Sequence, residues 1–184
     1  MTELESALVE VASLLEEIGL PYMLIGGLAV ALWGEPRATL DVDVSVWVEP
    51  QLFDETVQTI AGRFRTVSGA LEFAHRTRVL PVVTSQGIRA DIVFSALDEE
   101  RRMMGRAVIK RVGTANVPVA SVEDLIWMKL MSDRPKDQQD ARQLVHHFRE
   151  TLDRNYLDPK LEELAEAFAR TDIIDIYKDE MGRQ

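Results

Sequence analysis

The chain has 184 residues, of which 46% are hydrophobic and 28% charged, which fits one globular domain with at most a small appendage and excludes a disordered or large multidomain protein. Its 21 basic and 31 acidic residues give a net charge of −10, which argues against a surface adapted to non-specific nucleic-acid binding. Because there is no cysteine, disulfides, thiolate zinc sites and cysteine nucleophiles are excluded.

The first third of the chain predicts two helices and two strands. Apolar residues at helical spacing predict a first helix over residues 4–18, which ends at the break in residues 19–21. A short apolar strand over residues 22–25 runs into a double glycine, and residues 28–33 then form a short apolar helix. Residues 41–48 alternate strictly between valine and other residues, which is typical of a half-buried strand.

The middle of the chain predicts a helix over residues 52–61 and further strands. These strands are predicted at residues 64–67, 73–74, 79–84, 88–94, 107–112 and 117–119. Together with the first elements they make a mixed α/β part over residues 1–120.

From residue 121 the pattern is helical to the end, and we expect residues 121–184 to form a helical subdomain. Ser121 and Asp124 resemble a capping box, and Pro135 stands where a first-turn proline would. A further helix is predicted to start at Asp158, and a short last one covers residues 173–177.

Two aspartates stand out in the alternating strand. Asp41 and Asp43 project from the same face, since side chains two residues apart on a strand align, and together they form a natural chelate. Asp91 is a lone acid in a strand otherwise suited to the core, so it is the obvious third carboxylate. Carboxylate oxygens are the ligands that Mg²⁺ prefers, although two aspartates on a surface strand are also compatible with simple solvation.

Gly26 and Gly27 lie at the junction of a strand and a helix. Such a turn lets backbone N–H groups approach an anion, and the helix N-terminus adds a favourable partial charge, as a triphosphate would require. The alternative is that these glycines only allow close packing of the helix on the strand.

Taken together, these residues resemble the signature of the nucleotidyltransferase (DNA polymerase β-like) superfamily. The shared pattern is Gly26-Gly27, then thirteen residues, then Asp41-Val42-Asp43-Val44, and a later strand that bears Asp91. Within that superfamily, residues 25–43 are similar to the AbiEii-type toxins of type IV toxin–antitoxin systems and their relatives. The segments around residues 122–125, 129–130 and 134–140 resemble later motifs of the same family.

The resemblance implies a fold and a reaction. The fold is a minimal nucleotidyltransferase α/β core, with a short mixed sheet flanked by helices, followed by a C-terminal helical bundle. The reaction is the transfer of a nucleoside monophosphate from an NTP to an acceptor hydroxyl with two Mg²⁺ ions. Asp41 and Asp43 would hold both ions, and Asp91 would complete the first site and help to deprotonate the acceptor.

The resemblance also implies a set of nucleotide-binding residues. Lys129 would meet the triphosphate, and Asp137 and Asp140 would orient the nucleotide or the lysine. Arg37 near the glycine turn is a candidate phosphate contact, with a surface salt bridge as its alternative. Lys129 could equally be a surface lysine with a buried stem, and Asp137 could simply cap the first turn of its helix.

Three functions remain open at this stage. The first is an AbiEii-like toxin that acts on RNA such as tRNA ends, with an antitoxin as its protein partner. The second is a nucleotidyltransferase that modifies an antibiotic or another small molecule, and the third is an inactive NTP-binding module. Basic residues are concentrated in residues 63–89 and 101–111, so local basic patches are compatible with the overall acidity. No apolar run reaches the roughly 20 residues of a membrane helix, and the start of the chain is acidic, so we expect a cytoplasmic protein.

Overall fold

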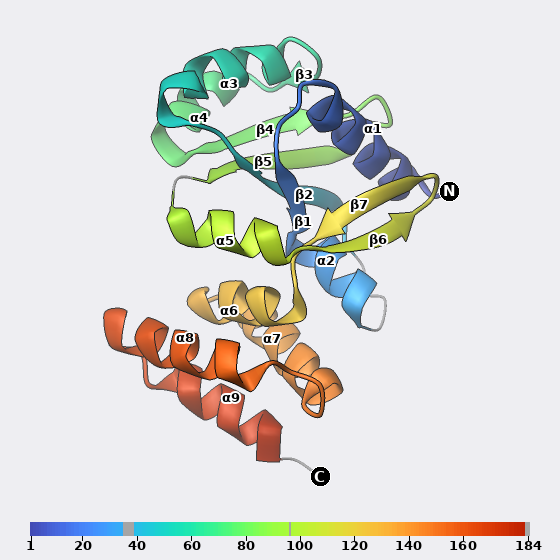
Figure 1. Ribbon diagram of the computed structural model, residues 1–184. Coiled ribbons are helices and arrows are strands. Elements are labelled where there is room, and N and C mark those ends of the chain that lie inside the picture. Colours follow the sequence, from blue (N-terminus) through green and yellow to red (C-terminus); the bar gives the residue numbers. More distant parts are fainter. Residues whose placement is uncertain (35–38, 96, 183–184) are drawn as a thin grey trace. The chain divides into compact units, whose positions relative to one another are not determined.

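The computed structural model describes residues 1–34, 39–95 and 97–182. These residues form a mixed α/β structure, as the sequence predicted, and it contains one seven-stranded sheet and nine α-helices (Figure 1). They group into two compact units, one made of residues 1–29 and 39–120 and the other of residues 30–34 and 121–182. Within these described ranges, no helix is long and apolar enough to cross a membrane.

The first unit holds the whole sheet. Its strands are β1 (Tyr22–Ile25), β2 (Asp41–Trp47), β3 (Arg65–Thr66), β4 (Val79–Val83), β5 (Arg89–Ser95), β6 (Val108–Val112) and β7 (Ala115–Val119). Its helical segments are α1 (Glu3–Glu17), the first half of α2 (Gly26–Trp33), the 3₁₀ turn Pro50–Leu52, α3 (Phe53–Ala61), α4 (Ala70–Thr77) and α5 (Asp98–Arg106). The strand order is β3-β4-β5-β2-β1-β7-β6 (Figure 1).

The alternation predicted for β2 gives the sheet two different faces. Val42, Val44 and Val46 are fully buried, and they share their face with the buried residues of β5. Helix α3 packs on this face, where the Phe53 ring meets Phe94 edge-on with 5.1 Å between centroids. The valine face of the sheet therefore forms part of the hydrophobic core, and the aspartate face does not.

Helix α1 packs on the same sheet, as the helical spacing of its apolar residues predicts. Its apolar stripe, including Leu8, Val11 and Leu15, is completely buried. The helix begins with a capping box, in which Thr2 accepts a hydrogen bond from the Glu5 N–H and the Glu5 carboxylate accepts one from Thr2.

The second unit is a helical bundle. Its helices are α6 (Val122–Met131), α7 (Pro135–Phe148), α8 (Arg154–Ala167) and α9 (Asp172–Gly182), and helix α6 packs on α7 and α8 while α9 packs on α7 and α8. Helix α6 is capped by the Ser121 side chain, and Pro135 occupies the first turn of α7, as predicted. The second half of α2 also belongs to this unit, where the Trp33 ring meets Phe148 edge-on at 5.7 Å.

Two predicted elements were wrong. Residues 73–74 lie inside helix α4 rather than in a strand, because Ala70, Phe73 and Ala74 recur at helical spacing and the two alanines are buried. Helix α8 begins at Arg154 instead of Asp158, because Asp153 caps it by accepting the Tyr156 N–H at 3.2 Å. Pro159 therefore lies inside the helix.

Candidate active site

Asp41 and Asp43 lie on the face of β2 opposite to the valine core, and both side chains are half-buried. The hydroxyl of Thr39 donates a hydrogen bond of 3.1 Å to the Asp41 carboxylate. The predicted arrangement of two acids on one face of one strand is therefore present.

The glycine turn is built around Asp43. Gly26 has a φ of +69°, in the left-handed region, and a Cβ atom added to it would lie 2.0 Å from Oδ2 and 2.7 Å from Cβ of Asp43. Only glycine meets both conditions, since any other residue would carry a Cβ atom where the carboxylate lies. Gly26 and the neighbouring Gly27 are the first residues of α2, so the helix N-terminus opens directly beside Asp43.

Asp91 lies on the strand next to Asp43. Strands β2 and β5 are parallel, and their register places Asp91 opposite Asp43 and Arg89 opposite Asp41. Because residues opposite each other in a sheet share a face, the three carboxylates all lie on the same face. The register was outside the reach of the sequence pattern, which predicted the strands but not their pairing.

Arg89 was missed as a partner of Asp91. Its Nε and one terminal nitrogen donate to the two Asp91 oxygens at 2.9 and 3.0 Å, a bidentate pair. The hydrogen bonds and charge of Asp91, together with the charges of Asp41 and Asp43, raise the pKa of the Arg89 guanidinium. The charges of all three acids therefore stabilise the Arg89 cation. The ion pair of Arg89 and Asp91 could have been predicted from the sequence, because side chains two residues apart on one strand share a face.

The three carboxylates fit Mg²⁺ in donor type, since they supply hard oxygen atoms from one face of a sheet. Across the described ranges, however, no group of three or more acidic or histidine side chains is arranged closely enough to hold a metal ion between them. The Asp91 oxygens are instead directed at Arg89. The three carboxylates therefore fit Mg²⁺ in their donor atoms and in their positions on adjacent strands. To bind the ion, Asp91 would have to give up its ion pair with Arg89.

In the second unit, the structure brings together Lys129, Asp137 and Asp140. The Lys129 ammonium lies 2.5 Å from Oδ1 of Asp137 and 3.0 Å from Oδ2 of Asp140. All three side chains are less than 10% exposed, so Lys129 is not a surface lysine. Burial disfavours the charged carboxylate of Asp137, but hydrogen bonds from Lys129 and Ser132 outweigh this and hold its pKa below the usual value.

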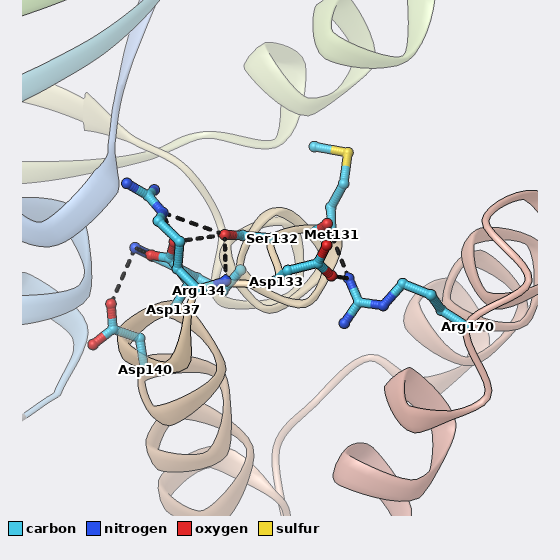
Figure 2. Close-up of polar contacts among 8 residues, drawn as sticks. Met131, Ser132, Asp133, Arg134, Asp137, Asp140 and Arg170 are labelled. Atoms are coloured by element: carbon cyan, nitrogen blue, oxygen red, sulfur yellow. Dashed lines mark hydrogen bonds and ion pairs between the residues drawn. The ribbon is translucent and has the colours of Figure 1, made fainter.

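Two arginines at this cluster were also missed. Arg134 donates through Nε to Asp137 at 2.7 Å, and both residues are drawn in Figure 2. The Arg134 side chain is 80% exposed. Arg170 binds the carbonyl of Met131 at 3.2 Å and the carboxylate of Asp133, which holds the segment between α6 and α7 (Figure 2). The three-residue spacing of Arg134 and Asp137 was a signal in the sequence, whereas the contact of Arg170 depends on the tertiary fold.

The remaining predicted phosphate contact, Arg37, lies outside the described residues.

Several solved structures are similar to this chain along most of its length. An antigenic nucleotidyltransferase-like protein from Paracoccidioides brasiliensis is similar at a TM-score of 0.57 and 17% identity, covering 96% of this chain and 92% of that one. The antibiotic-resistance factor ANT(2'')-Ia is similar at a TM-score of 0.48 and 14% identity, over 95% and 96% of the two chains. A CCA-adding enzyme in complex with ATP is similar at a TM-score of 0.36 and 14% identity, over 92% and 52%. The fold therefore matches that of the first of these, the nucleotidyltransferase-like protein.

The sequence itself identifies the family. Residues 13–176 match the model of the nucleotidyl transferase AbiEii toxin of type IV toxin–antitoxin systems. The chain belongs to this family, and it is a nucleotidyltransferase, a class of enzyme that transfers nucleoside monophosphates. No curated protein matches the sequence.

Proposed function

We propose that the chain transfers a nucleoside monophosphate from an NTP to an acceptor hydroxyl in a Mg²⁺-dependent reaction, with Asp41, Asp43 and Asp91 as metal-binding and catalytic residues. The observation that carries the proposal is the placement of three carboxylates on one sheet face beside a glycine turn that closes over Asp43. When bound, Mg²⁺ would neutralise phosphate charge and make the acceptor oxygen a better nucleophile.

The protein residues divide the remaining work. Backbone N–H groups at the start of α2, after Gly26 and Gly27, bind the triphosphate, which the helix N-terminus stabilises. Asp91 receives the proton of the acceptor hydroxyl once its pair with Arg89 has opened. The acceptor oxygen forms a bond to the α-phosphorus, the bond from this phosphorus to the β-phosphate oxygen breaks, and pyrophosphate leaves with the bonding electrons.

The Lys129 cluster serves the nucleotide indirectly in this proposal. Because its ammonium is buried between two carboxylates, a direct contact with phosphate would cost it an ion pair. Lys129, Asp137 and Asp140 therefore fix the start of α7, and the exposed side chain of Arg134 leaves its terminal nitrogens available to an anion.

The family suggests the biological setting. A member of a type IV toxin family is proposed to act in the cytoplasm on RNA, with a cognate antitoxin as its protein partner. An inactive module is the competing function, and it predicts that loss of a metal-binding carboxylate has no effect.

The test is pyrophosphate release from each NTP in the presence of Mg²⁺ and total RNA. Asp43→Asn keeps the shape of the side chain and is expected to lower the rate by at least about a hundredfold, since charge stabilisation in the transition state is lost. Asp54→Asn on α3, an exposed residue whose side chain is 80% accessible, is the matched control. Equal rates for wild type and both variants would refute the proposal.

A further inference from the structure

A cavity of about 370 Å³ opens within the first unit, and it is lined in part by Arg89 and by Pro81, the residue paired with Asp91. Its wall includes the β4 residues Pro81, Val82 and Val83, together with Arg89 and the α4 residues Phe73 and Arg76. Its volume falls in the range of sites that hold one small ligand or one residue of a polymer. Arg89 already has a part in the proposed reaction, whereas the other residues that line the cavity have no role in it so far.

The cavity continues a row of residues that crosses the active face. Pro81 pairs with Asp91 across β4 and β5, and Asp91 pairs with Asp43. Asp43 in turn pairs with Ile25, the residue before Gly26. Since neighbouring strands lie about 4.8 Å apart, the cavity wall is about 10 Å from Asp43 along this row. The cavity and the glycine turn therefore stand at opposite ends, with the carboxylates between them.

This order matches the geometry of phosphoryl transfer, and the inference from it rests on the proposed function. In that reaction the attacking and leaving oxygens lie roughly in line on opposite sides of the phosphorus. If the β- and γ-phosphates lie at Gly26, the acceptor hydroxyl must approach from the far side of the carboxylates. That side is where the cavity opens.

The lining of the cavity indicates which acceptor it takes. It carries the guanidinium groups of Arg76 and Arg89 against the single carboxylate of Glu72. Arginine forks suit phosphate oxygens and would repel a polycationic small molecule. The Phe73 ring lies in the same wall, 5.8 Å from the Arg76 guanidinium, and an aromatic ring can stack a base of any sequence.

We propose that this cavity binds the terminal nucleotide of the acceptor, with its phosphate at Arg76 and Arg89 and its base at Phe73. Arg89 connects the cavity to the catalytic acid, because the same guanidinium lines the cavity and holds both Asp91 oxygens. A phosphate in the cavity competes with Asp91 for Arg89. Binding of the acceptor therefore frees the Asp91 carboxylate to take the hydroxyl proton.

The experiment measures binding of a labelled single-stranded hexaribonucleotide to wild type and to Arg76→Glu. Arg76 is exposed and bonds to none of the catalytic acids, so its replacement should leave the fold and NTP binding unchanged. The expected result is at least a tenfold rise in the dissociation constant of the hexanucleotide. Arg111→Glu on β6, an exposed arginine at the opposite edge of the sheet, makes the same charge change and should alter it less than twofold.

Two competitors of the hexanucleotide, AMP and a polycationic amino sugar, test which kind of ligand the cavity binds. Displacement of the hexanucleotide by AMP at similar concentration would assign the cavity to a free nucleotide, and failure of AMP to compete would assign it to a polymer end. Equal effects of Arg76→Glu and Arg111→Glu would overturn the inference. So would displacement by a polycationic amino sugar whose own affinity is unchanged or improved by Arg76→Glu.

A separate readout keeps this inference apart from the proposed function. If wild type transfers labelled monophosphate to RNA and Arg76→Glu leaves the acceptor KM unchanged, only the cavity assignment fails. If wild type binds the hexanucleotide in the cavity but transfers no label from any NTP with Mg²⁺, only the proposed reaction fails.

Discussion

Replacement of Gly26 by alanine tests the link between the glycine turn and the catalytic carboxylates. Two separate penalties arise at this position. An alanine in the left-handed region, where Gly26 has a φ of +69°, costs about 1–2 kcal/mol on its own. The new Cβ atom would also lie 2.0 Å from Oδ2 of Asp43.

The second penalty cannot be relieved by the side chain alone. Rotation of Asp43 about its Cα–Cβ bond would move the carboxylate away, but its Cβ atom would remain 2.7 Å from the new methyl group. The turn or strand β2 must therefore shift as well, which adds about 1–3 kcal/mol of overpacking. We expect Gly26→Ala to lower the free energy of unfolding by about 2–5 kcal/mol in total.

Gly19→Ala is the matched control. Gly19 has a φ of +65°, and no atom lies within 4 Å of the position its Cβ would occupy. It carries the backbone penalty alone, so a loss of only about 1–2 kcal/mol is expected. Urea denaturation of the two variants measures the difference between them.

Activity separates the two variants further. A displacement of about 1 Å at a reacting centre can cost about a hundredfold in rate, so Gly26→Ala should reduce pyrophosphate release by that factor. Gly19→Ala should keep the rate of the wild type. The same loss of stability and the same activity in both variants would refute the argument that the glycine makes room for the carboxylate.

Three further predictions concern stability. Lys129→Met removes the ammonium that lies between the buried carboxylates of Asp137 and Asp140 and should cost about 3–5 kcal/mol in urea denaturation, whereas Lys136→Met at an exposed position should cost less than about 0.5 kcal/mol. The pKa of Asp137 is lowered in the folded state, so its contribution to stability is complete above the ordinary value of 3.8 and is lost as pH falls through the lower folded value. Asp137→Asn should therefore weaken the dependence of stability on pH in that acidic range, and an unchanged acid denaturation profile would contradict this. The buried hydroxyls of Ser45 and Ser95 lie 2.5 Å apart, and Ser45→Ala should destabilise the protein by about 1–3 kcal/mol because Ser95 loses its partner; a change below about 0.3 kcal/mol would count against the bond.

The sequence predicted those parts of the site that depend on local periodicity. The alternation around Asp41 and Asp43 was enough to place both acids on the face of their strand opposite to the valines, because a strand has a period of two. The glycine turn was equally visible, although its contact with Asp43 was not. That contact depends on the antiparallel pairing of β1 with β2, which brings residues 18 positions apart in the sequence into register.

The parts that escaped prediction depend on tertiary pairing or on weak local signals. The position of Asp91 beside Asp43 needed the parallel register of β2 and β5, which no pattern within either strand specifies. Phe73 was assigned to a strand because an isolated aromatic residue carries a weak β preference, and the helical spacing of its neighbours prevailed. Helix α5 was missed because it is highly charged and buries only Met103 among its apolar residues.

Metal binding tests most directly whether the carboxylates of Asp41, Asp43 and Asp91 form one site. Mn²⁺, which can be detected by paramagnetic resonance, should bind to the wild type in the presence of a non-hydrolysable NTP analogue. Asp41→Asn, Asp43→Asn and Asp91→Asn should each weaken this binding at least tenfold, because each removes one charged oxygen ligand. If Asp91→Asn bound Mn²⁺ as tightly as the wild type, the three acids would not form one site, and the proposed mechanism would be contradicted.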